Sequence, residues 1–370
     1  MTGPRYTPLA DSLPASVPFV GPEAQERARA RPFRARIGAN ESVFGPSPRA
    51  IAAMQDAAAD TWMYGDPENH DLRQALAAHE KTGPANIILG EGIDGLLGYL
   101  VRILVGPGDP VVTSDGAYPT FNYHVAGFGG ALHKVPYIGD HEDPDALVAK
   151  AREVDAKLIY LSNPDNPMGT WHDRATIEHM VSQIPDGTLL ILDEAYAQFL
   201  PEDAQPRIDP DDPRMIRMRT FSKAYGMAGA RVGYGIGHPE LITAFNKVRN
   251  HFGMARISQA GALAALDDQA YLANVLEQTA AARDRIAGIA AKHGLTTVAS
   301  AANFVAIDCG HDGDFARKVL SELIARDVFV RMPFVAPQDR CIRVSAGAEA
   351  DLAIFETAFA EALASARAGI

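Results

Sequence analysis

A lysine in the middle part of the chain lies where its side-chain amine could act as a nucleophile. Lys223 follows an apolar run, stands next to Ser222 in a turn rich in small residues, and precedes Arg231 by eight positions. An amine attacks a carbonyl group only in its neutral form, and partial burial beside another cation lowers the pKa of a lysine. The stretch therefore indicates Schiff-base chemistry at Lys223, with a surface lysine in a glycine-rich loop as the alternative.

Further candidates follow two other apolar runs upstream. Asp193 and Tyr196 come directly after the run of residues 188–192. Asn166 lies in the loop after the run that ends at Leu161. Ligands of open parallel sheets bind at the carboxyl ends of the strands, where a carboxylate can keep a pyridine nitrogen protonated. The alternatives are a helix cap at Asp193 and an ordinary turn around Asn166.

A glycine-rich turn offers a place for a phosphate group. Residues 90–95 read Gly-Glu-Gly-Ile-Asp-Gly, and Asp115 follows about twenty residues later, as in the dinucleotide-binding fingerprint. The turn itself only presents backbone N–H groups at the beginning of a helix, around Ile93 and Asp94, and any phosphate can bind there. A Rossmann dehydrogenase is the alternative from another reaction class, but it leaves Lys223 unexplained.

The elements that must position these residues alternate along the chain. Short apolar runs interleaved with amphipathic segments predict βαβ units, a mostly parallel sheet and helices on both of its faces. The expected strands are residues 86–89, 111–114, 131–135, 158–161, 188–192, 215–220 and 232–236. Among the expected helices are residues 71–81, 95–105, 144–151 and 174–183.

The pattern changes after about residue 240. A long helical stretch over 239–291, broken near Gly253 and around 267–269, precedes short strands and a terminal helix from Ala350. These strands are expected at residues 296–298, 304–307, 328–331 and 341–345. The fold class is thus α/β, with a large domain and a smaller α+β domain. We expect an extended, proline-rich arm and part of the small domain in 1–46, the large domain in 47–240 and the small domain in 241–370.

Charge and composition exclude several classes of protein. The 370 residues carry a net charge of −12, which argues against a nucleic-acid partner, because phosphate binding requires clustered cations. The two cysteines, Cys309 and Cys341, are too few for a disulfide framework or a zinc cluster, and we expect no metal. Neither a signal peptide nor an apolar run of membrane-spanning length is visible, so we expect a cytoplasmic protein without a membrane partner.

The ordered set of motifs resembles the class I/II aminotransferases of fold type I, in particular their histidinol-phosphate aminotransferase branch. The similarity covers nearly the whole chain, from about Pro18 to Gly347. Three more segments carry it: residues 37–41 with 45–48, Tyr64 with 66–67 and 72–73, and Arg343 with 344–347.

The resemblance implies pyridoxal 5'-phosphate as the cofactor, held by Lys223 as a Schiff base. Lys223 would also move the proton between the α-carbon and C4′. Asp193 would pair with the pyridine nitrogen, and Asn166 and Tyr196 would hold the phenolic oxygen. The implied phosphate ligands are Ile93, Asp94, Ser222, Arg231 and Tyr64 of the partner subunit. The implied substrate-binding residues are Asn40, Arg331 and Arg343.

Several residues depart from the usual pattern of the branch. Alignment from Pro119 puts His124 where a tyrosine usually covers the pyridine ring, with Tyr123 one residue earlier. Phe19 stands where a tyrosine often reaches toward the phosphate of the substrate. The other departures are Ser42 and Val43, Met168, and residues 332–334 after Arg331. These changes surround the substrate, whereas the set of cofactor residues is intact.

The resemblance therefore predicts a homodimeric pyridoxal-phosphate-dependent aminotransferase. Its small-molecule partners would be an amino acid or an amine derived from one, resembling histidinol phosphate, and a 2-oxo acid as acceptor. A decarboxylase or an oxidising enzyme on the same scaffold is the first alternative, because geometry decides which bond breaks. A transcription regulator is the second, although about forty residues before the fold are too few for a helix-turn-helix domain.

Overall fold

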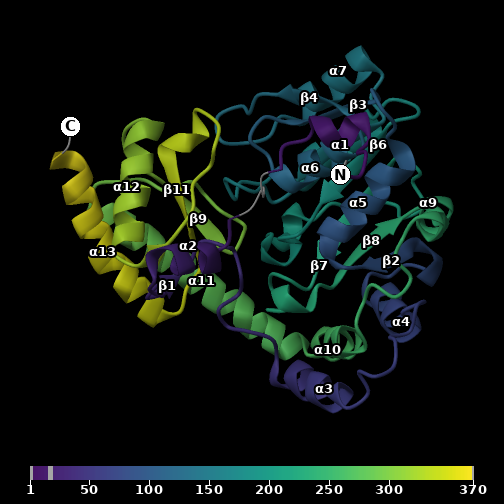
Figure 1. Cartoon of the computed structure of the whole chain (residues 1–370), viewed down its shortest axis with the longest axis horizontal. Helices are drawn as coiled ribbons and strands as arrows, with labels where there is room; N and C mark the ends of the chain where they lie inside the picture. Colours follow the sequence, from purple (N-terminus) through teal and green to yellow (C-terminus); the bar gives the residue numbers. More distant parts are fainter. Residues whose placement is uncertain (1–2, 16–19, 369–370) are drawn as a thin grey trace.

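The larger part of the molecule is built around a seven-stranded sheet (Figure 1). The structure, a computed structural model, describes residues 3–15 and 20–368. The strands lie in the order β2-β8-β7-β6-β5-β3-β4, and β8 alone runs antiparallel to its neighbours in this sheet. Their bounds are β2 Ile87–Gly90, β3 Pro110–Ser114, β4 Ala131–Val135, β5 Leu158–Ser162, β6 Leu189–Asp193, β7 Met215–Thr220 and β8 Gly233–Gly237. The prediction of a mostly parallel sheet is confirmed.

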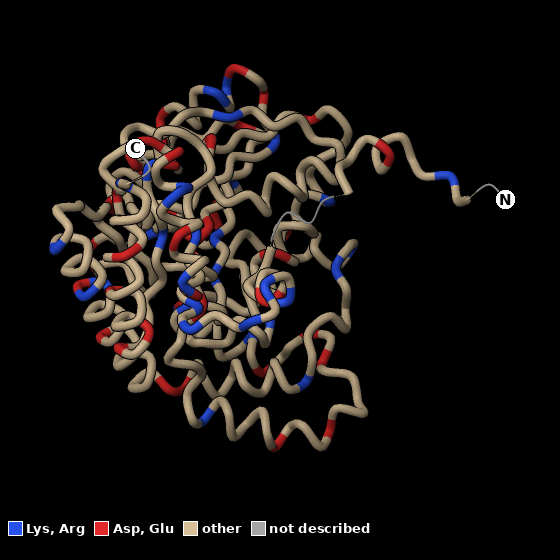
Figure 2. Tube along the Cα trace, turned by 60° about the vertical axis from the view of Figure 1, so that its left-hand side comes forward, with Lys and Arg blue, Asp and Glu red and all other residues tan. Residues whose placement is uncertain are grey.

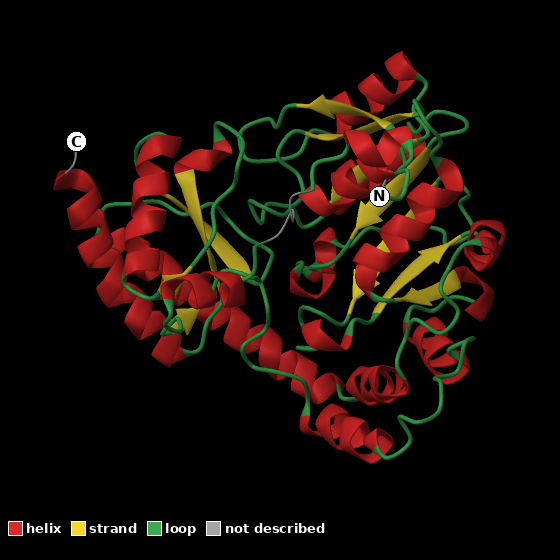
Figure 3. Ribbon diagram, viewed as in Figure 1, coloured by secondary structure: helices red, strands yellow, loops and turns green. Residues whose placement is uncertain are grey.

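Helices cover both faces of this sheet (Figure 3). Successive residues of a strand point to opposite faces, so an apolar run such as β6 is buried on both sides. Ile191 packs on one face, and Leu190 and Leu192 pack on the other. The first face is covered by α5 (Gly92–Leu104), α6 (Pro119–Gly127) and α9 (Pro239–Ala244). The second is covered by α7 (Pro144–Val154) and α8 (Arg174–Ser182).

Aspartates fix where several helices begin. Asp143 and Asp173 accept backbone hydrogen bonds at the beginning of α7 and α8. Asp268 and Asp312 do the same for α11 (Gln269–Lys292) and α12 (Gly313–Ala325). A side-chain oxygen at this position satisfies a backbone N–H that has no partner inside the helix. The sequence thus sets the loop lengths that place each strand end.

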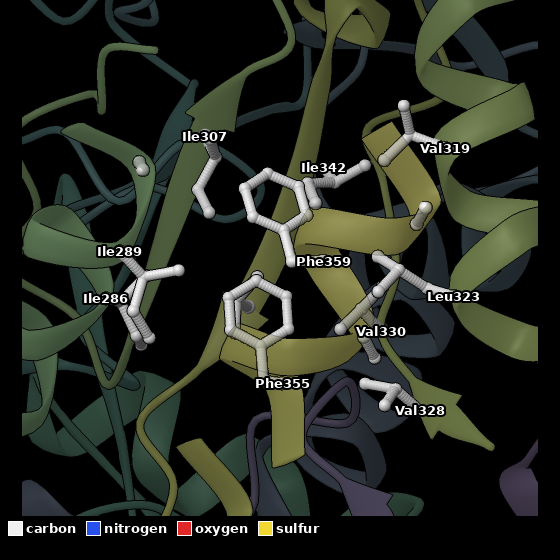
Figure 4. Close-up of a cluster of buried hydrophobic side chains, with 14 of the residues drawn as sticks. Ile286, Ile289, Ile307, Val319, Leu323, Val328, Val330, Ile342, Phe355 and Phe359 are labelled. Carbon is white, nitrogen blue, oxygen red and sulfur yellow. The ribbon is translucent and has the colours of Figure 1, made fainter. Parts of the chain in front are cut away.

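The smaller domain has its own apolar core (Figure 4). Phe355 and Phe359 stack at its centre, with ring centroids 5.0 Å apart, and contact residues from strands and helices around them. Strands β9 and β11 pair antiparallel, while β1 and β10 pair in parallel. The bounds are β1 Ala35–Arg36, β9 Phe304–Asp308, β10 Val328–Phe329, β11 Cys341–Ser345 and α13 Glu349–Ala368. Cys309 and Cys341 are both buried and have free thiols.

The packing changes from one domain to the other within α11. Leu272 in its first turns belongs to the core cluster of the large domain, whereas Ile286 and Ile289 belong to that of the small domain. Helix α10 (Arg256–Asp267) packs on α3 (Pro48–Ala58) and α4 (His70–His79) of the large domain. The expected boundary at residue 240 therefore falls within α9, and both α9 and the later α10 pack with the large domain.

The N-terminal region differs from the extended arm that its prolines predict. It contains α1 (Pro8–Ser12) and α2 (Pro22–Arg29), because a proline is compatible with the first helical position of each. Phe19 lies outside the described residues. The strand expected at residues 296–298 is reduced to a single bridge between Thr297 and Ile307.

Charged side chains of both signs are interspersed along the chain (Figure 2). The early arginines have acidic partners: Arg36 pairs with Glu23 and Glu26, and Arg29 pairs with Asp327. In the part of the chain that the structure describes, no helix is long and apolar enough to cross a membrane.

Candidate active site

One cavity at the carboxyl ends of β5, β6 and β7 collects most of the predicted cofactor residues. Asp193 is the last residue of β6, and Thr220, the last residue of β7, leads directly into the turn with Lys223. Parallel strands end at the same edge of a sheet, so segments far apart in sequence meet there. The predicted residues that line this cavity are Ile93, Asp94, Asn166, Asp193, Tyr196, Ser222, Lys223 and Arg231.

Lys223 reaches into this cavity from the turn after β7. Its Nζ donates a hydrogen bond to the backbone oxygen of Asn40 at 3.0 Å and lies 5.5 Å from the centre of the Tyr196 ring. Burial, aided by the positive charge of Arg343, lowers the pKa of Lys223 to about 8. The neutral, nucleophilic form of the amine is therefore accessible near neutral pH.

Asp193 is buried in the wall of the same cavity and has two neutral donors. Its Oδ2 accepts a hydrogen bond from the Tyr160 hydroxyl at 2.6 Å, and its Oδ1 accepts one from the backbone N–H of Ala195 at 2.9 Å. Burial raises the pKa of Asp193 to about 6. A buried carboxylate that neutral groups hold in place suits a ligand that brings a positive charge, and a protonated pyridine nitrogen is such a group.

A cradle for a phosphate group lies at the beginning of α5. Gly92 has a φ of 76°, and a Cβ atom there would lie 2.3 Å from the Nη2 of Arg231. Only glycine therefore lets this guanidinium approach the turn. The Nη2 of Arg231 donates to the backbone oxygen of Glu91 at 3.3 Å, and its Nη1 lies 3.4 Å from the Ser222 hydroxyl. A guanidinium, a hydroxyl and the N–H groups of a helix start fit a phosphate.

Asn40 and Tyr196 meet at the boundary with the small domain. The Nδ2 of Asn40 donates to the Tyr196 hydroxyl at 3.0 Å, and the Oδ1 of Asn40 accepts from the Ser345 hydroxyl at 3.0 Å. Burial raises the pKa of Tyr196, so its hydroxyl stays protonated and can donate to a ring oxygen. The site is thus compatible with each polar position of pyridoxal phosphate: phosphate, ring nitrogen, ring oxygen and aldehyde.

A second cavity adjoins the first and shares Asn166 and Tyr118 with it. Arg331 and Arg343 enter it from the small domain, and Lys134 enters from β4. Arg343 is buried and donates to the side-chain oxygen of Asn166. Burial beside Arg343 lowers the pKa of Arg331 to about 10, so the guanidinium of Arg331 remains charged at neutral pH. This cavity is suited to a substrate with anionic oxygens.

The structure places Tyr118, and not His124, on the wall of both cavities. Helix α6 begins at Pro119, so Tyr118 precedes its first turn and faces the strand ends. His124 lies more than a full turn later, packs over Gly98 of α5, and its Nε2 lies 2.8 Å from Oδ1 of Asp94. His124 therefore lines neither cavity, in contrast to its predicted place over the ring, and contacts Asp94 instead. The position of Tyr118 directly before a helix-starting proline was the sequence signal for this residue.

Tyr64 lies outside the cavity of its own chain. Its side chain is 75% exposed and packs on Phe252, with ring centroids 4.7 Å apart. Trp62 nearby in sequence is 80% exposed. Large aromatic side chains with this exposure are typical of surfaces that contact another protein.

Residues 36–359 match the family described as aminotransferase class I and II. The chain belongs to this family. It is similar to the histidinol-phosphate aminotransferase of Moorella thermoacetica, with 33% identity over 89% of this chain and 85% of that one. It is also similar to histidinol-phosphate aminotransferase 1 of Thiobacillus denitrificans, with 35% identity over 93% of this chain and 89% of the relative.

A solved structure extends the likeness to the whole molecule. The histidinol-phosphate aminotransferase of Sinorhizobium meliloti, in complex with pyridoxal 5'-phosphate, has 53% identity and a TM-score of 0.95, and the match covers 98% of this chain and 99% of that one. The chain is therefore a pyridoxal-phosphate-dependent aminotransferase of fold type I. Neither the family match nor these relatives support the decarboxylase or oxidase alternative.

Proposed function

We propose that this aminotransferase works as a cytoplasmic homodimer and moves the amino group of histidinol phosphate, or of a similar anionic amine, to a 2-oxo acid. The observation that carries the proposal is the pair of adjoining cavities. One is lined by Lys223 and Asp193, and the other by Arg331 and Arg343. The family relatives named above support the choice of substrate.

Bound pyridoxal phosphate supplies an aldehyde that captures amines and a ring that accepts electrons from the α-carbon. In the proposed assignment, the Nζ of Lys223 holds the aldehyde carbon and then moves the proton at the α-carbon. Asp193 keeps the ring nitrogen protonated, while Asn166 and Tyr196 donate to the ring oxygen. Ser222, Arg231, Ile93 and Asp94 hold the phosphate, and Tyr118 covers the ring.

The substrate side of the proposal depends on the two arginines. Histidinol phosphate carries a phosphate group and no carboxylate, whereas glutamate and 2-oxoglutarate carry two carboxylates. Both kinds of molecule offer anionic oxygens that a guanidinium can bind through two hydrogen bonds. Arg343, beside Asn166, is assigned to the anionic group nearest the reacting carbon, and Arg331, on the wall of the same cavity, to a second anionic group where the substrate has one. Asn40, whose side chain donates to the Tyr196 hydroxyl, keeps its assignment as a substrate-binding residue.

A donor screen tests the substrate. With 2-oxoglutarate as acceptor, the kcat/KM for histidinol phosphate is expected to exceed that for histidinol by about 10²-fold or more. Histidinol lacks the phosphate, so a guanidinium of the site has no anionic partner when histidinol binds. Histidinol is the matched control, since it differs only in the phosphate. Equal values for the two amines, or release of carbon dioxide in place of a 2-oxo product from an amino-acid donor, would contradict the proposal.

A mixing experiment tests the shared site of the homodimer. We propose that Tyr64 of the partner subunit reaches the cofactor phosphate, so Lys223→Ala and Tyr64→Ala impair different halves of one site. Refolding the two variants together is expected to restore about one quarter of wild-type activity, because half of the dimers are mixed and each has one intact site. Each variant refolded alone is the control. No recovery in the mixture would show that Tyr64 acts within its own subunit or not at all.

A further inference from the structure

Two buried carboxyl groups lie behind the wall of the cavities, and none of the roles assigned above uses them. Glu142 and Asp165 are each 2% exposed, and their carboxyl groups lie close enough to interact with each other. Glu142 precedes α7, and Asp165 lies in the loop after β5, directly before Asn166. Burying two acidic side chains against each other is costly, so the arrangement calls for a physical explanation.

Glu142 joins the ends of two neighbouring strands. Its Oε1 accepts the backbone N–H of Ser162 at 2.9 Å, and its Oε2 accepts the hydroxyl of Ser114 at 2.6 Å. Ser162 is the last residue of β5, and Ser114 is the last residue of β3. The carboxyl group therefore fixes the strand ends from which the loops around the cavities begin.

Asp165 holds the loop that carries Asn166. Its Oδ1 accepts the hydroxyl of Tyr137 at 2.9 Å, and its Oδ2 accepts the backbone N–H of Met168 at 2.8 Å. The side-chain oxygen of Asn166 in turn accepts from Arg343. A continuous series of contacts thus runs from the strand ends through the two carboxyl groups to the guanidinium in the substrate cavity.

Two carboxylates in contact away from water cannot both be charged, because their repulsion is poorly screened there. Four groups face the pair. They are the hydroxyls of Tyr137 and Tyr160, the guanidinium of Arg343, which binds Asn166, and His172, whose Nε2 contacts the backbone oxygen of Glu142 at 2.9 Å. None of these contacts is a direct ion pair with either carboxyl group. One proton between the two carboxyls satisfies the geometry, with one acid donating and the other accepting.

We propose that Glu142 and Asp165 share one proton at neutral pH and act together as a positioning pair for Asn166 and Arg343. The inference rests on the proposed function, because it concerns the residues assigned to the ring oxygen and the substrate anion. Burial raises the pKa of Glu142 well above its usual range and that of Asp165 to about 7. Both directions agree with a pair that holds its proton as a unit.

Substitutions at Glu142 distinguish two explanations: a proton shared by the two carboxyl groups, and a requirement for a negative charge at position 142. Glu142→Gln keeps a neutral donor toward Asp165 and an acceptor toward Ser162, so KM and kcat of the holoenzyme are expected to stay within about threefold of wild type. Glu142→Ala removes both contacts and is expected to raise the KM for the anionic donor about tenfold or more, with a smaller change in kcat, because Arg343 loses its support.

The pH dependence gives a readout that a merely structural role would not change. A carboxyl group with a raised pKa in the folded protein stabilises it at low pH, and this contribution is lost as pH rises through the raised value. The wild-type KM is therefore expected to rise on the alkaline side, and this rise is expected to be absent in Glu142→Gln. The Tm of the wild-type holoenzyme should also fall as pH rises from about 5 to about 7, between the unfolded and the folded pKa of the carboxyl group, where one proton changes the folding equilibrium up to about tenfold per pH unit.

The outcomes are distinct. If Glu142→Gln is as impaired as Glu142→Ala, or if it keeps the alkaline rise in KM and the steep fall in Tm, the shared proton is excluded. If Glu142→Ala does not fold, the comparison of wild type with Glu142→Gln still shows whether the two carboxyl groups share a proton. If the wild-type protein shows no transamination, the proposed function fails, whereas the difference in Tm between wild type and Glu142→Gln still tests the pair.

Discussion

Replacing Lys223 by alanine is expected to abolish covalent attachment of pyridoxal phosphate and to lower kcat by at least about 10³-fold. The reason is that one amine performs two tasks: it captures the aldehyde and moves the proton at the α-carbon. Borohydride reduction of the loaded protein, followed by peptide mass analysis, should tag a peptide that contains Lys223 in the wild type and none in the variant. Lys150→Ala is the matched control, because Lys150 pairs with Glu153 on an exposed helix surface.

The same lysine predicts a characteristic pH dependence of cofactor loading. With a pKa of about 8, roughly half of the Lys223 amines are neutral at pH 8, against less than about 1% for a lysine with the usual value of 10.5. The rate of attachment should therefore rise with pH and level off near pH 8 to 9. A rate that continues to rise to pH 10, or a reduced cofactor bound at another lysine, would contradict the assignment of Lys223.

The residues at the strand ends could be predicted from sequence because their spacing follows the topology. Lys223, Asp193 and Asn166 each follow an apolar run, and parallel strands bring such positions to one edge without any knowledge of packing. Side-chain direction within a helix needs finer information. A shift of a few residues in α6 separates Tyr118, which lines the cavities, from His124, which contacts Asp94.

Other features depend on contacts between distant segments and leave little local signal. The two-residue strand β1 pairs with β10 across almost three hundred residues, and no alternation of apolar residues marks it. The passage from one domain to the other occurs within the continuous helix α11, whose sequence has no break there. Glu142 and Asp165 look like surface acids in the sequence, and only the fold shows that they are buried together.

Replacing Asp193 by asparagine is expected to lower kcat by about 10² to 10⁴-fold while the protein remains folded. Asparagine is close in shape, and the hydroxyl of Tyr160 can rotate to accept a hydrogen bond from the new amide. However, the amide carries no charge, so it cannot keep the ring nitrogen protonated, and the ring becomes a weaker electron acceptor. Single-turnover rates with a saturating amino donor, measured together with the Tm, would separate the chemical step from stability.

The neighbouring carboxylate provides the matched control for this prediction. Glu194 points away from the cavity and forms buried ion pairs with Arg217 at 2.9 Å and Arg219 at 2.7 Å. Glu194→Gln leaves two buried cations with a weaker partner, so it should cost about 3 kcal/mol of stability or more and leave kcat of the folded protein nearly unchanged. The two adjacent acids are thus expected to have opposite effects. Asp193→Asn lowers the rate of the chemical step and keeps the Tm, whereas Glu194→Gln lowers the Tm and keeps the rate. A variant of Asp193 with an unchanged single-turnover rate would show that the ring nitrogen does not need this carboxylate, and the assignment of the cavity walls would have to change.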